Sequence, residues 1–149
     1  SFDNIGAGQQ IAAAMYDRGV DVIFAAAGGV GVGVINEAKN RASSGKNVWV
    51  VGVDVDQYSE GLMPNGKSII LTSAMKYLDR ASYDMIEHEL NGTFPGGTKL
   101  YLDATNDGVG IPVENPNLDK SVMDEVASVY AKLKSGAVKV ADSGDGLFK

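Results

Sequence analysis

The sequence contains no cysteine in its 149 residues. Disulfide bonds, thiol nucleophiles and thiolate metal sites are therefore excluded, although a chain without cysteine is equally compatible with the cytosol and with the cell exterior. Basic residues are also few. The 13 Lys and Arg are outnumbered by 19 Asp and Glu, which gives a net charge of -6, and they are scattered along the chain. Nucleic-acid binding is therefore not expected.

Long apolar runs are missing as well. No stretch approaches the roughly 20 apolar residues needed to span a bilayer, and the first residues lack the basic-then-apolar pattern of a secretion signal. Hydrophobic residues nevertheless make up 44% of the sequence, which is enough for one domain of this length to bury most of its unfolded surface. We expect one lobe over residues 1–140 and a disordered tail over 141–149.

Short apolar runs alternate with segments of helical periodicity. Strands are predicted at residues 22–27, 48–53, 69–72 and 98–102, the first three of them buried. Helices are predicted over 8–18, from the following glycine cluster to about residue 42, over 74–90 and over 119–136. This alternation predicts an α/β fold with a doubly wound parallel sheet and helices on both faces. Ligands of such sheets bind beyond the carboxyl ends of the strands.

A glycine cluster, Gly28-Gly29-Val30-Gly31-Val32-Gly33, lies where the first strand passes into a helix. Missing side chains there let a ligand approach the backbone amides of a helix N-terminus. The spacing departs from the dinucleotide fingerprint G-x-G-x-x-G, because Val34 occupies the third glycine position. Two other interpretations stay open: binding of NAD with Asp54 as the acidic partner, and a small-residue turn that only permits close packing.

Asp54 ends the second apolar strand, so its carboxylate is expected beside the ligand site. An ionised carboxylate accepts up to four hydrogen bonds and can hold both hydroxyls of a vicinal diol such as ribose. Asp56 points the same way if the chain stays extended. Alternatively, either aspartate caps the following turn, or the two contribute to a calcium site that lacks other ligands.

Lys76 and Phe2 are the other candidate ligand-binding residues. Lys76 is predicted in the first turn of a helix, where the helix dipole disfavours a cation, which suggests a task such as pairing with Asp54. A solvated surface lysine is the alternative. Phe2 precedes the first helix, and an aromatic ring at that rim can stack on a nucleobase, although a terminal phenylalanine is more often a packing residue.

Several motifs in order resemble the basic membrane lipoprotein family, the purine nucleoside receptors of ABC transporters. The matching segments are residues 19–24, Ala27-Gly28-Gly29-x-Gly31-x-Gly33-Val34, residues 48–57, Leu71-Thr72-Ser73-x-x-Lys76, Gly92-x-Phe94-x-Gly96-Gly97 and Gly108-Val109. The resemblance implies a periplasmic-binding-protein type I lobe. It also implies a ligand cleft between two lobes, to which this chain contributes Phe2, Gly28 or Gly29, Asp54 and Lys76.

The resemblance further implies a solute-binding protein without enzymatic activity, resident cofactor or metal. We expect a full-length parent that is lipid-anchored outside the cell membrane, has a first lobe absent from this chain, and delivers a nucleoside to an ABC permease. Residues 98–140 are then expected to include a crossover into the first lobe and the last helix, and the isolated chain is expected to self-associate. The alternatives are a Rossmann-type oxidoreductase that uses NAD and a sugar or autoinducer receptor.

Overall fold

A computed structural model describes residues 2–141 and 144 of the chain. They belong to two compact units, one of residues 1–77 and 109–118 and the other of residues 78–108 and 119–149. The earlier expectation of one lobe over 1–140 stays a prediction. The predicted disordered tail lies, apart from Ala141 and Gly144, outside the described residues.

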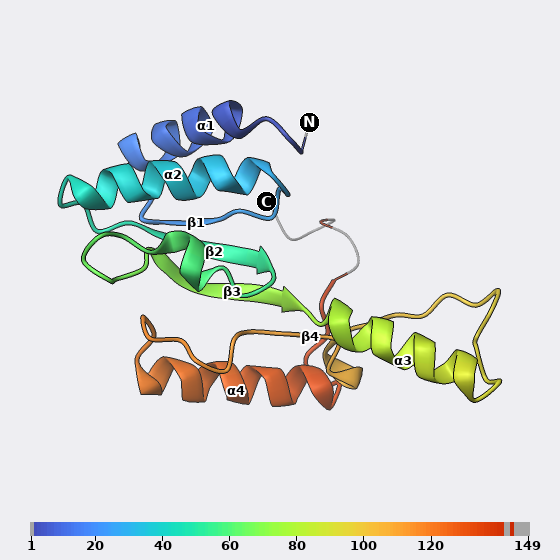
Figure 1. Ribbon diagram of the computed structural model, residues 1–149. Coiled ribbons are helices and arrows are strands. Elements are labelled where there is room, and N and C mark those ends of the chain that lie inside the picture. Colours follow the sequence, from blue (N-terminus) through green and yellow to red (C-terminus); the bar gives the residue numbers. More distant parts are fainter. Residues whose placement is uncertain (1, 142–143, 145–149) are drawn as a thin grey trace. The chain divides into compact units, whose positions relative to one another are not determined.

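The first unit is an α/β sheet with two helices. Its elements are α1 (Ile5–Asp17), β1 (Val22–Phe24), α2 (Val30–Ser43), β2 (Trp49–Asp54), the 3-10 helix η1 (Tyr58–Gly61), β3 (Ile70–Lys76) and β4 (Val109–Gly110). The strand order is β1-β2-β3-β4 (Figure 1). The first three strands are parallel, which confirms the predicted α/β class, and β4 adds a short antiparallel edge.

Two of the predicted strands are wrong in extent or place. β3 runs to Lys76 because its later residues pair with β2 and with β4, so Lys76 ends a strand and does not lie in a helix. Residues 98–102 form no strand. The described part of the second unit offers them no other strand to pair with, and a lone strand in water is not stable.

β1 is also less buried than its apolar sequence predicts. Ile23 is 6% exposed and belongs to the core, whereas Val22 and Phe24 are 37% and 57% exposed. Side chains alternate between the two faces of a strand, and only the Ile23 face meets the helices of this unit. β1 therefore behaves as an edge strand with one covered face.

The core of the first unit lies between α1, α2 and the sheet, and α1 packs on α2. Its buried members are Ala12, Tyr16, Ile23, Ala25, Val34, Ile35, Ala38, Val48, Val50, Ile69 and Ile70. The two helices approach closely through glycine: a Cβ added at Gly33 would lie 2.0 Å from the carbonyl oxygen of Ile5, and one at Gly8 would lie 2.3 Å from that of Val30. No side chain fits at either position without moving backbone.

Residues 109–118 return to the sheet and are fastened to β3 by two asparagines. Asn117 Nδ2 donates to the carbonyl oxygens of Ser68 and Ile70, at 3.0 and 2.7 Å. Thr72 Oγ1 donates to Asn115 Oδ1 at 2.6 Å. The asparagine side chains thus act on the β3 edge where β4 is too short to pair.

Replacing Asn117 with alanine is expected to lower the free energy of unfolding by about 2 kcal/mol, because two carbonyl groups of a half-buried edge lose their donor. Urea unfolding of the chain followed by circular dichroism measures this loss. Asn36→Ala, at an exposed helical position, is the matched control and is expected to leave stability unchanged or slightly raised. An equal effect of the two substitutions would show that the hydrogen bonds of Asn117 do not contribute to stability.

The second unit contains α3 (Leu78–Leu90), the 3-10 helix η2 (Ala104–Asn106) and α4 (Lys120–Lys134). Asp107 joins η2 to α4: both of its carboxylate oxygens lie 2.7 Å from Lys134 Nζ, and Tyr130 Oη donates to it at 3.1 Å. Asp119 occupies the N-cap position of α4 but its side chain makes no capping hydrogen bond. Neither α3 nor α4 buries any residue fully, so this unit leaves apolar surface uncovered.

Candidate functional site

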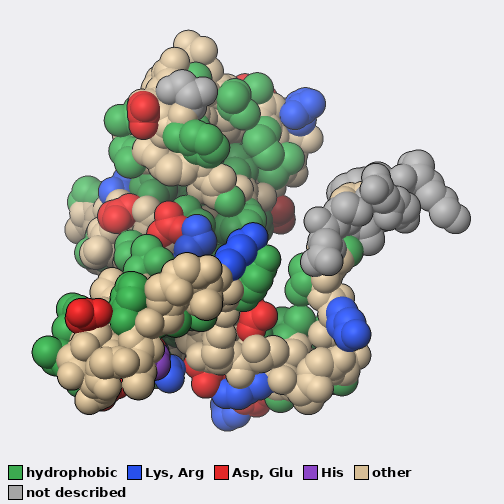
Figure 2. Space-filling view, turned by 90° about the vertical axis from the view of Figure 1, so that its right-hand side faces the viewer, with side chains coloured by type: hydrophobic (Ala, Val, Ile, Leu, Met, Phe, Trp, Pro, Cys, Tyr) green, Lys and Arg blue, Asp and Glu red, His purple; other side chains and the backbone are tan. Residues whose placement is uncertain are grey.

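The carboxyl ends of β1, β2 and β3 lie together at one end of the first unit, where the chain also begins (Figure 1). This is the edge at which parallel α/β sheets bind ligands. Phe2, Gly28, Asp54 and Lys76 all belong to the first unit and lie at or next to these ends. Figure 2 views this side and shows hydrophobic side chains among charged ones at the surface.

Asp54 adopts an unusual backbone conformation at the end of β2. Its φ is 71°, and the N–H of Val55 donates to the carbonyl of Val53 at 2.9 Å, which closes a three-residue turn around Asp54. A non-glycine residue with positive φ is uncommon, and aspartate tolerates the conformation better than most. The chain therefore turns sharply at Asp54, so the condition under which Asp56 would point the same way, an extended chain, is not met.

Asp54 and Lys76 form an ion pair across the ends of β2 and β3. Lys76 Nζ lies 2.7 Å from Asp54 Oδ1, and the two side chains are 57% and 45% exposed respectively. Oδ1 is buried, and no donor lies at hydrogen-bond geometry to it, so its contact with Lys76 is that of an ion pair. Because the side chain as a whole is 45% exposed, acceptor capacity for a ligand lies with the other carboxylate oxygen.

Asp56 has a different task from Asp54. Its Oδ1 accepts from the backbone N–H of Tyr58 at 3.0 Å, two residues on, and so caps the turn that leads into η1. The interpretation that one aspartate caps a turn thus holds for Asp56. Within the described residues, no group of three or more acidic or histidine side chains is placed to hold a metal ion.

Phe2 lies against the glycine turn that follows β1. Gly28 has φ 56°, and a Cβ there would lie 3.4 Å from both the Cβ and the carbonyl oxygen of Phe2. Gly29 is the N-cap of α2 in a helical conformation, and its added Cβ would lie 3.2 Å from the Phe2 carbonyl oxygen. The Phe2 side chain is 70% exposed. Its ring is thus held at the rim without being buried.

The glycines of the cluster are required for different structural reasons. Gly28 serves the left-handed turn, whereas Gly33 permits α1 and α2 to touch. At the N-terminus of α2, the N–H of Val30 already donates to the Phe2 carbonyl oxygen at 3.1 Å. This arrangement is unlike a dinucleotide site, in which those amides face a pyrophosphate.

Sequence reasoning missed three residues of this region. Phe24 ends β1 with a 57% exposed ring, and the alternation of side chains along an edge strand could have indicated it. Ser73 is fully buried on β3, and Gln57 bonds to it from the turn after β2. No pattern in the sequence singles out Gln57, because its role depends on Ser73 of β3, which only the folded sheet brings to it.

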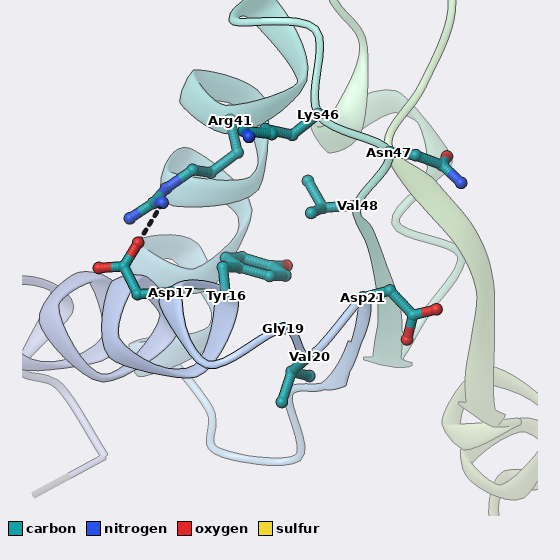
Figure 3. Close-up of a pocket in the computed structure, with 9 residues that line it drawn as sticks. All are labelled: Tyr16, Asp17, Gly19, Val20, Asp21, Arg41, Lys46, Asn47 and Val48. Carbon is teal, nitrogen blue, oxygen red and sulfur yellow. Dashed lines mark hydrogen bonds and ion pairs between the residues drawn. The ribbon is translucent and has the colours of Figure 1, made fainter.

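A pocket with a volume of about 310 Å³ lies at the opposite end of the sheet (Figure 3). It is lined by residues before β1, residues before β2 and the ends of α1 and α2, namely Tyr16, Asp17, Gly19, Val20, Asp21, Arg41, Lys46, Asn47 and Val48. Arg41 is engaged there by Asp17 at 2.5 Å and by Glu37 at 2.7 Å. The amino ends of parallel strands are not where such sheets bind ligands, so we place the candidate site elsewhere.

The ion pairs of Arg41 with Asp17 and Glu37 are expected to make the stability of the chain depend on pH. Hydrogen bonding by Arg41 holds the pKa of the buried Glu37 carboxyl below its ordinary value of 4.5. A depressed folded-state pKa gives stability that is present above the unfolded-state pKa and lost as pH falls through the folded-state value. Glu37→Gln is therefore expected to flatten the fall of the urea midpoint between about pH 5 and about pH 3. Glu89→Gln, at an exposed position, is the control. If the urea midpoint falls equally steeply with pH in the two variants, Glu37 does not cause the pH dependence.

Comparison with known proteins identifies the class of this ligand-binding fold. The family model of ABC transporter substrate-binding proteins of the PnrA-like type, Bmp, matches residues 1–143. The chain therefore belongs to the Bmp family of ABC transporter substrate-binding proteins. This is a family of binding proteins and not of enzymes, and the predicted family is confirmed.

Curated relatives agree with this assignment. The chain is 43% identical over 141 residues to a "CD4+ T-cell-stimulating antigen" of Listeria monocytogenes, covering 91% of this chain and 40% of the relative. It is 38% identical over 148 residues to the "ABC transporter nucleoside-binding protein BmpA" of Lactococcus lactis, covering 94% and 41%. It is 35% identical over 144 residues to "Basic membrane protein D" of Borreliella burgdorferi, covering 94% and 40%. The chain thus spans about 40% of the length of these relatives.

Solved structures share the fold. An ABC transporter solute-binding protein from Aeropyrum pernix superposes with a TM-score of 0.75 at 25% identity, over 98% of this chain and 47% of that one. A transcriptional activator of the comK gene from Bacillus halodurans superposes with a TM-score of 0.78 at 18% identity, over 95% and 46%, which shows likeness of fold alone. Among the described residues, no helix combines the length and apolar character needed to cross a membrane.

Proposed function

We propose that this chain forms the second-lobe side of a nucleoside-binding cleft, in a solute-binding protein that captures purine nucleosides outside the cell membrane. The observation that carries the proposal is the Asp54–Lys76 ion pair at the carboxyl ends of the strands, in a member of a substrate-binding family. A relative that is 38% identical is named a nucleoside-binding protein. We further propose that the full-length protein is lipid-anchored and delivers its ligand to an ABC permease.

Asp54 and Lys76 suit the ribose of a nucleoside. The ion pair uses one carboxylate oxygen, and the Asp54 side chain remains 45% exposed. An ionised carboxylate accepts up to four hydrogen bonds, which leaves room for two adjacent hydroxyl donors. The lysine ammonium has three donors, so it can bind a hydroxyl oxygen while it neutralises the aspartate. The pair thus offers both acceptors and donors to a diol.

Phe2 suits the base. Its ring is 70% exposed, and the hydrogen bond from Val30 holds its backbone, so the residue is fixed at the rim before a ligand binds. A base stacked on such a ring gains about 1–3 kcal/mol. Phe24, the last residue of β1, adds a second exposed aromatic ring at a strand end of this unit.

The second unit has an exposed apolar stripe on α3 that suits an interface with another part of the protein. Along α3, Tyr83, Ile86 and Leu90 are 66%, 62% and 82% exposed, and their spacing of three and four residues places them on one stripe. An apolar stripe of this kind usually marks an interface. Because the relatives are about two and a half times as long as the matched region, we propose that the first lobe covers it. Without that lobe, the stripe favours self-association.

An NMR titration of the chain tests the ligand class. We expect inosine, guanosine and adenosine to shift the backbone amides of Gly28, Asp54 and Lys76, and ribose to shift only those of Asp54 and Lys76. The amide of Gly45, at the amino end of β2, serves as the internal control. Shifts with NAD alone would favour the oxidoreductase alternative, and shifts with free sugars but no nucleoside would favour a sugar receptor. Either result would overturn the proposal.

A further inference from the structure

We propose that Gln57 and Ser73 are positioning residues for the ligand carboxylate of Asp54. They form a polar brace with Gly52 beneath the turn that follows β2, which we call the Gln57 brace. The brace has no ligand contact of its own in this proposal. The inference rests on the proposed function, since it assigns the residues that hold Asp54 where a ribose can reach it.

The turn needs to be held because it is strained. Asp54 is a non-glycine residue at φ 71°, at the centre of a three-residue turn with positive φ, the rarer and more strained form of this turn. Such backbone conformations persist only where the surroundings enforce them, and they cluster at functional sites. Without support, the turn would relax and move the Asp54 carboxylate relative to Lys76.

Gln57 supplies the support from one side. Its Oε1 accepts from the backbone N–H of Val53, the residue directly before Asp54, at 2.9 Å. Val53 lies two positions beyond Val51, the last β2 residue in register with β1, so a side chain here takes the place of a ladder partner. The other end of the amide, Nε2, donates to Glu60 Oε2 at 2.5 Å, which fixes the orientation of the amide group.

Ser73 supplies the support from the other side. It is 0% exposed, and its Oγ accepts from the backbone N–H of Gln57 at 3.1 Å. A hydroxyl buried on a central strand is typically retained only where it is hydrogen-bonded, and this bond fastens the far end of the turn to β3. The residues before and after the strained turn are thus both fixed by the brace.

Gly52 gives the brace its space. A Cβ added at Gly52 would lie 2.6 Å from Ser73 Oγ, 2.8 Å from Gln57 Oε1 and 3.0 Å from Gln57 Cβ. Glycine is therefore the residue that lets both polar side chains approach the backbone of β2. A glycine, a buried serine and a glutamine from three separate positions thus converge on one turn.

Calorimetric titration of the full-length protein with inosine tests the brace. Gln57→Met keeps the length of the side chain but removes the acceptor, and is expected to weaken binding about fivefold to tenfold, the ratio that one hydrogen bond represents. Gln57→Glu retains an acceptor for Val53 but would set its carboxylate against that of Glu60, so it is combined with Glu60→Gln, which restores a donor at that contact. The double variant is expected to recover most of the loss. Ser59→Ala, at an exposed position of the same 3-10 helix, is the control and is expected to bind like the parent protein.

A double-mutant cycle with Asp54→Ala separates positioning from a general structural role. The Gln57→Met change is expected to cost no further affinity once Asp54 is gone, because the brace acts only through that carboxylate. Equal losses from Gln57→Met and from the Gln57→Glu/Glu60→Gln double variant, or an undiminished loss from Gln57→Met in the Asp54→Ala background, would overturn the inference. If Asp54→Ala itself leaves affinity unchanged, the proposed function fails and the brace fails with it.

Discussion

Replacing Asp54 with alanine is expected to weaken nucleoside binding by the full-length protein by about a hundredfold or more. The substitution removes the acceptor for two ribose hydroxyls, and hydrogen bonds to a charged group are each worth about 1.5–3 kcal/mol. It also leaves the ammonium of Lys76 without its 2.7 Å partner in the bound state. Calorimetric titration with inosine measures the change.

Two further variants keep this result interpretable. Asp54→Asn retains a residue that tolerates positive φ and is expected to lose less affinity than Asp54→Ala, because one amide oxygen still accepts. Asp56→Ala removes the cap on Tyr58 and is expected to lower stability by about 1 kcal/mol with little change in affinity. If Asp56→Ala weakens binding as much as Asp54→Ala, the assignment of separate roles to the two aspartates is wrong.

Replacing Gly33 with alanine is expected to destabilise the chain by about 3 kcal/mol or more, which is a large effect for one methyl group. Its Cβ would lie 2.0 Å from the carbonyl oxygen of Ile5 and 2.7 Å from the backbone nitrogen of Gln9, so whole helices must separate. Alanine is otherwise the better helix former by about 1 kcal/mol. A loss of stability would therefore indicate the close contact between the helices, because helix propensity alone predicts a gain.

Gly6→Ala is the matched control within α1. Its added Cβ has Asn4 Oδ1 as nearest neighbour at 3.6 Å, an ordinary contact, and the substitution is expected to stabilise by up to about 1 kcal/mol. Urea unfolding of both variants, followed by circular dichroism, gives the comparison. Effects of the same sign at both positions would contradict the close α1–α2 approach.

Much of the fold follows from local patterns. The apolar runs before Gly28 and Asp54 predicted β1 and β2, and the ordered motifs predicted the family that comparison confirms. The sequence-based predictions were wrong where the pairing of strands determines the structure. β3 extends to Lys76 because the strands beside it continue. Residues 98–102 form no strand because the described part of the second unit contains no strand to pair with them. Neither reason is visible in a single segment.

The candidate site could also be predicted only in part, because some of its residues depend on local patterns and others on contacts of the folded sheet. Strand ends are readable from sequence, so Asp54 and Lys76 could be named and expected to pair. The glycine cluster was ambiguous because one spacing serves two needs: a left-handed turn at Gly28 and a helix contact at Gly33. Gln57 was missed because its role depends on a turn whose backbone only the folded sheet defines.

The most direct test of the account compares inosine with 2′,3′-dideoxyinosine by calorimetric titration of the full-length protein. The two ligands share the base, so stacking on Phe2 is unchanged, and they differ in the hydroxyls assigned to Asp54 and Lys76. The account predicts that inosine binds and that the dideoxy analogue binds about a hundredfold more weakly or worse. Equal affinity for the two ligands, or no binding of either, would contradict it.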